Sequence, residues 1–181
     1  MVQLPVMARL YFTGIKHSGK TTQARLAASL LSIPYADSDD LVLSLTGAES
    51  VREYFKEHGK DKFMEAEREA LSAFLNNNDS FILSLGGGAA DNAPLMQLMK
   101  KTGKIIYLKR NENEMLPVIL KHGMPAFLDP EDVEGSFHKV YARRDAVYSE
   151  AADLVVDLGP YRDKEETARM LVEKLKENGY V

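Results

Sequence analysis

The feature that most constrains the fold of this chain is a glycine-rich segment between a predicted strand and a predicted helix. It reads Gly14-Ile15-Lys16-His17-Ser18-Gly19-Lys20-Thr21, which fits the pattern of a glycine, four residues, a glycine, a lysine and a serine or threonine. A chain of this composition matches the pattern by chance in roughly one of two hundred cases. Residues 8–13 predict a buried strand and residues 19–31 a helix. The pattern therefore stands in the strand-loop-helix context that phosphate binding requires.

Each residue type in this segment has a chemical reason. Glycines let the backbone wrap closely around phosphate oxygens, while amide hydrogens and the helix N-terminus supply partial positive charge. Lys20 brings an ammonium group to the outer phosphates, and the Thr21 hydroxyl can ligate Mg²⁺. A plain strand-turn-helix corner is the alternative, and the full pattern favours a nucleoside triphosphate site. The candidate nucleotide-binding residues are Gly14, His17, Ser18, Gly19, Lys20, Thr21 and Thr22, with His17 expected to contribute its backbone.

Length and charge limit the other classes of protein. The 181 residues indicate a single domain over 1–181, and 45% hydrophobic residues supply a core. The net charge of −4 argues against a protein held to nucleic acid by its overall field. The absence of cysteine excludes disulfides and thiolate metal sites. Because no apolar run is long enough for a bilayer and residues 1–10 lack a secretion signal, we expect a cytoplasmic monomer without nucleic-acid or membrane partners.

Hydrophobic periods of about 2 and about 3.6 residues alternate along the chain, which is typical of strand-helix-strand units and a largely parallel sheet. Residues 122–134 contain two prolines and little periodicity, and they are too long for an ordinary connection, so we expect a lid there. Strands are predicted at 8–13, 34–37, 81–85, 104–108 and 154–157, and helices at 19–31, about 38–47, 49–57, 62–75, about 93–100, up to 150, and 164–177.

A second polar motif, Asp37-Ser38-Asp39, follows a short predicted strand. Residues at this end of a parallel strand face the crevice where such sheets bind ligands. One carboxylate could hold Mg²⁺ through water while the other takes a proton from a substrate hydroxyl. Aspartate is also a frequent helix cap, and the two roles can coexist.

Two further motifs complete an ordered set. One is Ser84-Leu85-Gly86-Gly87-Gly88, and the other is Arg144 followed by Tyr148, Ala152-Asp153 and a strand. Together with the phosphate loop and Asp-x-Asp, they resemble the shikimate kinase family in order and spacing over nearly the whole chain. The resemblance implies an α/β, three-layer P-loop kinase fold, with a five-stranded parallel sheet flanked by helices. It also implies a mobile lid at about 122–134 and substrate-binding helices at about 38–75.

The resemblance further implies a reaction, in which the γ-phosphoryl group of ATP passes to a hydroxyl of shikimate with Mg²⁺ as cofactor. By position, Lys20 and Asp39 would be catalytic, and Thr21 and Asp37 would serve Mg²⁺. Arg144 would pair with the substrate carboxylate. The other residues implied are Asp39, Glu67, Gly86, Gly87 and Gly88 for substrate and Arg162 for adenine.

Two positions depart from the family pattern. Met64 stands where the family has an arginine three residues before the acidic Glu67, and Met124 stands where the lid has an arginine before proline. A charged hydrogen bond contributes about 1.5–3 kcal/mol, so two losses would weaken the binding of an acid. Two hypotheses stay open. Either Arg68, with Lys121 or His122 in the lid, replaces the missing cations, or the methionines line an apolar pocket for an acceptor without a carboxylate.

Alternatives to a shikimate substrate remain at this stage. One is a kinase of the same fold whose acceptor is a gluconate-like sugar acid, another alcohol or a nucleotide. Asp39 and the Gly86–Gly88 segment favour a hydroxyl acceptor, and the middle of the chain lacks the extra arginines that a nucleotide acceptor needs. The other is a nucleotide-binding regulator with little turnover, suggested by the missing lid cation.

Overall fold

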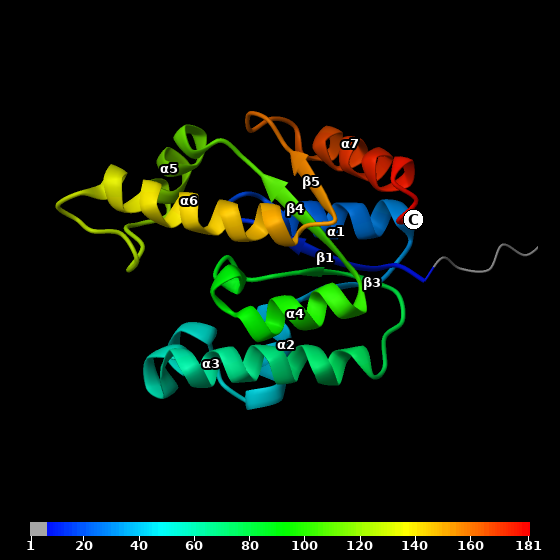
Figure 1. Cartoon of the computed structure of the whole chain (residues 1–181), viewed down its shortest axis with the longest axis horizontal. Helices are drawn as coiled ribbons and strands as arrows, with labels where there is room; N and C mark the ends of the chain where they lie inside the picture. Colours follow the sequence, from blue (N-terminus) through cyan, green and yellow to red (C-terminus); the bar gives the residue numbers. More distant parts are fainter. Residues whose placement is uncertain (1–6) are drawn as a thin grey trace, which may run out of the picture.

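Five parallel strands form the middle layer of the protein (Figure 1). In the order β2-β3-β1-β4-β5, they span Tyr35–Asp37, Phe81–Ser84, Arg9–Thr13, Lys104–Lys109 and Leu154–Asp157. The computed structural model describes residues 7–181, so residues 1–6 of the predicted domain lie outside the described range. Strands β1 and β3 are covered on both faces, which is why they are almost continuously apolar. The predicted five-stranded parallel sheet is confirmed.

Helices cover both faces of this sheet. On one face, α1 (Lys20–Leu31) and α7 (Lys164–Glu177) bury residues such as Ala24 and Leu171 against the strands. On the other face, α4 (Ala93–Thr102) and α6 (Val133–Ala151) contribute residues such as Met99 and Phe137. The remaining helices are α2 (Ser38–Thr46), which packs on α3 (Val51–Leu75), and α5 (Glu112–Lys121). No helix within residues 7–181 is both long and apolar enough to cross a membrane.

Three elements differ from the sequence prediction. The helices predicted at 49–57 and 62–75 form one element, α3, which breaks only at Gly59, where φ is 81° and ψ is 176°. Helix α5 was not predicted, because Pro117 inside it interrupts the helical pattern. The lid comprises residues 122–132, and the last two residues assigned to it, Val133 and Glu134, begin α6. In Figure 1 the lid is the loop that extends beyond the ends of α5 and α6.

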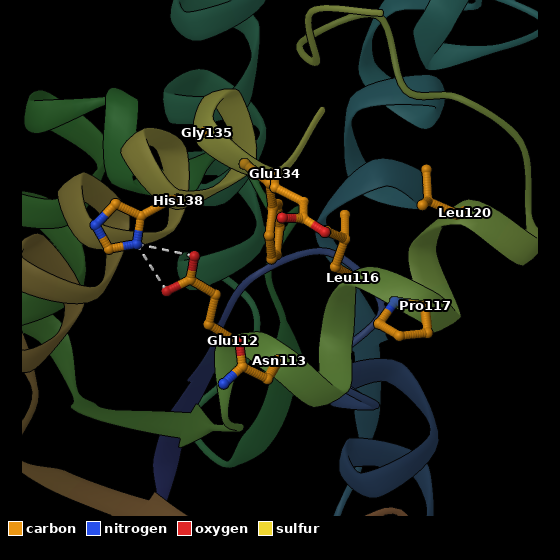
Figure 2. A pocket seen from close by; sticks show the side chains of 9 residues that line it. Glu112, Asn113, Leu116, Pro117, Leu120, Glu134, Gly135 and His138 are labelled. Atoms are coloured by element: carbon orange, nitrogen blue, oxygen red, sulfur yellow. Dashed lines mark hydrogen bonds and ion pairs between the residues drawn. The ribbon is translucent and has the colours of Figure 1, made fainter. Parts of the chain in front are cut away.

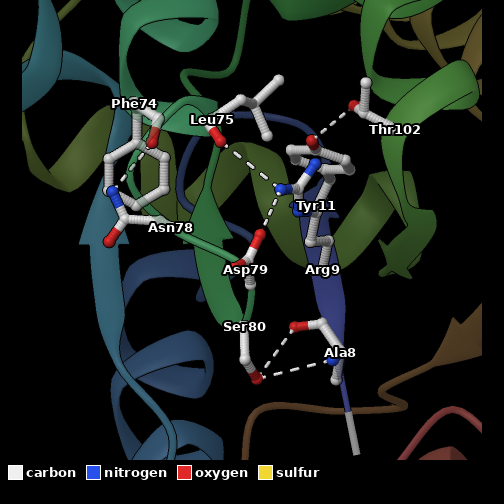
Figure 3. A network of polar contacts seen from close by, with 9 residues as sticks. All are labelled: Ala8, Arg9, Tyr11, Phe74, Leu75, Asn78, Asp79, Ser80 and Thr102. Atoms are coloured by element: carbon white, nitrogen blue, oxygen red, sulfur yellow. Dashed lines mark hydrogen bonds and ion pairs between the residues drawn. The ribbon is translucent and has the colours of Figure 1, made fainter.

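The edge of the sheet where the strands begin is fastened by paired polar groups (Figure 3). The Arg9 guanidinium donates to the Asp79 carboxylate at 2.9 Å. The hydroxyls of Tyr11 and Thr102 lie 2.7 Å apart, and Tyr11 is fully buried. The Ser80 hydroxyl lies within hydrogen-bonding distance of the backbone just before β1. These contacts join α3, α4 and the first strands, so this edge is a structural one.

Candidate active site

The opposite edge, where the parallel strands end, opens into a cavity of about 590 Å³. Most of the predicted site residues line it, although they come from four separate parts of the chain. They are His17, Lys20, Thr21, Asp37, Asp39, Glu67, Gly86, Gly87, Gly88 and Arg144. Gly14, Ser18 and Gly19 form the loop behind this wall, while Thr22 is exposed in the first turn of α1 and does not line the cavity.

The phosphate loop has a backbone that only its glycines allow. Gly14 has a φ of +153°, and a Cβ there would lie 2.7 Å from the carbonyl oxygen of Leu108 and 2.9 Å from the Ser18 hydroxyl. Gly19 is left-handed at φ +96° and begins α1. The loop therefore turns its amides inward at a helix N-terminus, which is the arrangement that binds phosphate.

Lys20 is almost fully buried in this loop, and its ammonium group donates to the carbonyl oxygen of Ile15 at 3.0 Å. Burial lowers the pKa of Lys20 to about 8, while the carboxylates of Asp37 and Asp39 raise it in part. A buried ammonium group lacks the water that would stabilise its charge. Anionic phosphate oxygens supply that stabilisation, so the site is suited to a nucleotide.

Thr21 and Asp37 meet beside the loop, with 3.5 Å between the Thr21 hydroxyl and the Asp37 carboxylate. Mg²⁺ prefers such oxygen ligands, and it commonly uses one or two protein groups together with phosphates and water. Among residues 7–181 no group of three or more His, Cys, Asp or Glu side chains is placed for a metal, which fits this kind of shared site. Asp37 also caps α2 by accepting from the Asp39 amide at 2.9 Å. The predicted capping role is thus confirmed, and it leaves the second carboxylate oxygen of Asp37 facing Thr21.

Two carboxylates face the glycine segment that follows β3. A Cβ on Gly86 would lie 3.4 Å from Asp39 Oδ1 and 4.0 Å from Glu67 Oε1. A Cβ on Gly87 would lie 2.9 Å from the backbone nitrogen of Lys16, so this glycine lets the segment approach the phosphate loop. The glycine segment thus links the nucleotide side of the cavity to the carboxylate side.

Both carboxylates have altered acidity. Burial, followed by the charges of Asp37 and Asp40, raises the pKa of Asp39 above its ordinary value. Burial raises the pKa of Glu67 to about 7, although a hydrogen bond of 2.9 Å from the Asn92 amide lowers it in part. Perturbed carboxyl groups in a cleft are typical of sites that handle protons.

Arg144 is buried at 9% exposure on α6 and is not a solvated surface charge. It donates to the Asp91 carboxylate at 3.2 Å, and the Phe127 ring of the lid lies 5.4 Å from the guanidinium. Its Nε is buried without a hydrogen-bond partner among the described residues. A buried donor without a partner in a cavity wall is satisfied by an anionic ligand. Arg144 therefore suits the carboxylate of a substrate.

The two methionine positions differ in their surroundings. Met64 lines the cavity, and its backbone carbonyl accepts from the Asn92 amide at 2.9 Å. Arg68 is exposed and lines a separate neighbouring cavity, so the hypothesis that it fills the space left by Met64 is wrong. The cavity also holds Arg143, Arg144 and Lys60, which does not fit a purely apolar acceptor pocket.

Met124 is 51% exposed in the lid and lines a second cavity of about 850 Å³ between the lid and the phosphate loop. Lys121 does not line either cavity. His122 does reach the loop, where its ring stacks on that of His17 with 4.4 Å between centroids. The side chain of His17 thus has a contact that the sequence did not predict, because only its backbone was expected to take part.

The lid is held between α5 and α6, and an ion pair joins these helices at its base. His138 Nδ1 lies 2.9 Å from Glu112 Oε1, as Figure 2 shows. Beside this pair a cavity of about 660 Å³ separates the helices, with Leu116 and Pro117 along its wall. Few buried apolar contacts mark the parts of a protein that move most readily. The supports of the lid are therefore more loosely packed than the sheet.

Sequence reasoning missed Arg110, a buried residue directly after β4. It donates to the carbonyl oxygens of Ser18 and Gly159, each at 2.8 Å. Its guanidinium lies 3.9 Å from the centre of the Tyr161 ring, and the Tyr161 hydroxyl donates to the His17 carbonyl oxygen at 2.8 Å. These contacts hold the phosphate loop to the segment after β5. A charged residue immediately after a buried parallel strand was the available signal.

Arg162, predicted for adenine, lies beside this clamp. It is exposed and lines neither cavity, and a Cβ on Gly159 would lie 2.8 Å from one of its terminal nitrogens. The structure thus places Arg162 next to the nucleotide loop but does not bring it to the other predicted residues.

A phosphate-binding loop at one end of a closed crevice, with proton-accepting carboxylates and a buried arginine at the other, defines a small-molecule phosphotransferase of the P-loop class. The family model for shikimate kinase matches residues 16–176, and the chain belongs to that family. It is thus an ATP-dependent kinase.

Individual relatives agree with this assignment. The chain is 31% identical over 163 residues to the shikimate kinase of Stenotrophomonas maltophilia (strain R551-3), covering 90% of this chain and 89% of the relative. A shikimate kinase of Burkholderia lata is 30% identical over 84% of this chain and 82% of its own.

Solved structures show the same fold. The shikimate kinase from Acinetobacter baumannii in complex with shikimate has a TM-score of 0.82 at 24% identity, covering 96% of each chain. The enzyme from Aquifex aeolicus has a TM-score of 0.76 at 25% identity, covering 94% of this chain and 98% of its own.

Proposed function

We propose that this protein transfers the γ-phosphoryl group of ATP to a hydroxyl group of shikimate, with Mg²⁺ as its cofactor. The observation that carries the proposal is that Arg144, Asp39 and the phosphate loop line one cavity. A small hydroxy acid placed there can pair its carboxylate with the buried guanidinium and present a hydroxyl to Asp39. The likeness to shikimate kinases supports shikimate as that acid.

On the nucleotide side, the loop amides and Lys20 would hold the triphosphate, and Thr21 with Asp37 would hold Mg²⁺. The metal, when bound, offsets negative charge on the phosphates. Because Lys20 is already buried in the loop, its charge is in place before the reaction begins. Positioning of this kind supplies most of the catalysis in phosphoryl transfer.

On the acceptor side, Asp39 would take the proton of the reacting hydroxyl as its oxygen bonds to the γ-phosphorus. The bond between that phosphorus and the bridging oxygen of ATP breaks, and ADP leaves with the electron pair. The raised pKa of Asp39 makes it a stronger base than an ordinary aspartate. Gly86 and Gly87 leave room for the acceptor between the two carboxylates and the loop.

A second candidate is a kinase of the same fold that acts on another hydroxy acid, such as a gluconate-like sugar acid. Met64 in the cavity wall favours it, because an expected cation is missing there. Arg144 would hold the carboxylate in either case. A neutral alcohol, a nucleotide acceptor or a regulator with little turnover remains an alternative for the assay to test.

The direct test is ADP release from Mg-ATP by the purified protein, with and without shikimate, using Lys20→Met as the blank. We expect saturable release that depends on shikimate. If ATP binds but shikimate does not stimulate release, while a sugar acid, an alcohol or a nucleotide does, the proposed substrate is wrong and the second candidate gains support.

We also propose that the protein acts as a monomer in the cytoplasm, on ATP and a small hydroxylated substrate. The acidic net charge supports the lack of a nucleic-acid partner. Light scattering after gel filtration tests the oligomeric state, and a mass of twice 20.2 kDa would contradict it.

A further inference from the structure

One carboxylate in the cavity binds two neighbouring arginines of α6. Asp91 accepts from Arg144 at 3.2 Å through one oxygen and forms an ion pair with Arg143 through the other. Both arginines and Asp91 line the same cavity as Asp39 and the glycine segment. Arg143 is therefore drawn from the surface of α6 toward the acceptor side of the site.

The position of Asp91 is built into the fold. It lies in η1, a short 3-10 helix spanning Ala89–Asp91 directly after the glycine segment. The Ala90 amide donates to the Tyr148 hydroxyl at 3.1 Å, and that hydroxyl donates to the Gly87 carbonyl oxygen at 3.2 Å. Asn92, the next residue, is buried and donates to Glu67. Bonds on both sides thus hold Asp91 in place.

Asp91 remains a carboxylate in this setting. Burial alone would raise its pKa, but the hydrogen bonds and charges of Arg143 and Arg144 lower it below the ordinary value. Two guanidinium groups around one carboxylate leave one net positive charge. Each guanidinium has five N–H donors and gives only part of them to Asp91, so both keep donors for a second carboxylate.

Met64 lies in the wall of this same cavity and offers no charge to an acid. Lys60 also lines the cavity, but it is exposed and directly follows the break at Gly59. Arg143 is better suited to an anion, because a bound carboxylate already fixes its guanidinium beside Arg144.

We infer that Arg143, held by Asp91, binds the carboxylate of the acceptor together with Arg144 and supplies the second cation that Met64 does not. The inference rests on the proposed function in that the acceptor is a hydroxy acid, and it makes Arg143 a determinant of specificity for acids over neutral alcohols. The sequence departs from the family pattern at Met64, yet the structure retains two cations at this end of the cavity.

The test compares Arg143→Met with Arg68→Met, an identical change at an exposed arginine outside the cavity. We expect Arg143→Met to raise the KM for shikimate about tenfold, with kcat and the KM for ATP within about twofold. Arg68→Met leaves all three unchanged. Arg143→Lys recovers part of the loss because it restores the charge.

Selectivity gives a readout that a general structural defect does not move. The wild type is expected to prefer shikimate over its methyl ester, which lacks the negative charge. Arg143→Met reduces this preference in kcat/KM about tenfold, since it weakens only the charged substrate. Equal preference in the wild type and in Arg143→Met overturns the inference.

Calorimetric titration with shikimate separates this inference from the proposed function. If shikimate binding depends on Arg143 but ADP release does not depend on shikimate, the inference stands and the proposed function fails. If shikimate drives turnover with the same KM in Arg143→Met and Arg68→Met, the inference fails and the function stands. If shikimate neither binds nor drives turnover, both are wrong.

Discussion

At the edge where the strands begin, Arg9 is paired with Asp79, and the Tyr11 hydroxyl is paired with that of Thr102. At the edge where they end, the ammonium group of Lys20 reaches only a loop carbonyl, and Arg144 keeps a buried N–H without a partner in the described chain. The same sheet thus has one edge with satisfied polar groups and one edge that is incomplete. The difference teaches where stability and where ligand binding reside.

Physical chemistry explains this division. A buried polar group without a partner costs about 1–3 kcal/mol, so a chain keeps one only where something offsets the cost. At the first edge the partners belong to the protein, and the contacts stabilise it. At the second edge a ligand must supply them, and the cost of burial is recovered on binding.

The largest difference between the edges is expected for Lys20→Met. The change removes the charge beside the transferred phosphate, so activity falls by about 10³- to 10⁵-fold. Stability does not fall, because the variant no longer buries an ammonium group. ADP release and thermal unfolding measure the two quantities. A variant that unfolds at a clearly lower temperature would show that Lys20 stabilises the fold as well.

Asp39→Asn is the next largest. An amide cannot accept the hydroxyl proton, so kcat falls by about 10²- to 10⁴-fold while ATP still binds. Asp40→Asn is the matched control, since this exposed neighbour does not line the cavity. Steady-state kinetics with shikimate measures both. Similar losses in the two variants would contradict the role assigned to Asp39.

Glu67 sharpens the comparison through pH. Its pKa is about 7 in the folded protein against an ordinary value of 4.5, so the folded state holds a proton that the unfolded state has lost between these values. The stability that this proton contributes is lost as the pH rises through about 7. Glu67→Gln is therefore expected to stabilise the protein by about 2–3 kcal/mol at pH 8, and by little at pH 4.5.

Urea unfolding of Glu67→Gln at both pH values measures this effect. Glu69→Gln, an exposed glutamate on the same helix, is the control and should show no gain. A gain of equal size at both pH values would mean that Glu67 is not the group that titrates.

The smallest effect is expected at the first edge. Tyr11→Phe removes the hydrogen bond to Thr102 and costs about 1 kcal/mol, or a fall of about 2–4 °C in Tm. Activity is unchanged because Tyr11 lies at the end of the sheet away from the site. Differential scanning calorimetry and the ADP assay measure the two. A change in kcat beyond about twofold would mean that the two edges are coupled.

Much of the fold was predictable because local patterns specify it. Buried parallel strands are continuous apolar runs, and the phosphate loop carries its own signature in consecutive residues. The helix around Pro117 was not predictable in this way, since its proline breaks the pattern that reveals helices. The boundary of the lid at Val133 is similarly a matter of where a cap falls.

The site was predictable only where its residues belong to motifs. Arg110 lies 92 residues from Ser18, and Asp91 lies 53 from Arg144, so no local spacing shows that they meet. Arg68 was expected in the cavity because it is one helical turn from Met64. That argument fixes the side of the helix but not which of two adjacent cavities a long side chain enters.

The clamp formed by Arg110 has a consequence for the order in which a growing chain becomes active. The phosphate loop leaves the ribosome early, but its carbonyl groups are held through Arg110 and Tyr161, and Tyr161 lies 144 residues after His17. Strand β5 must dock before Gly159 and Tyr161 can support the loop. Because synthesis proceeds from the N-terminus, the first motif to be made is among the last to be completed, and a partly synthesised chain has no finished nucleotide site with which to consume ATP.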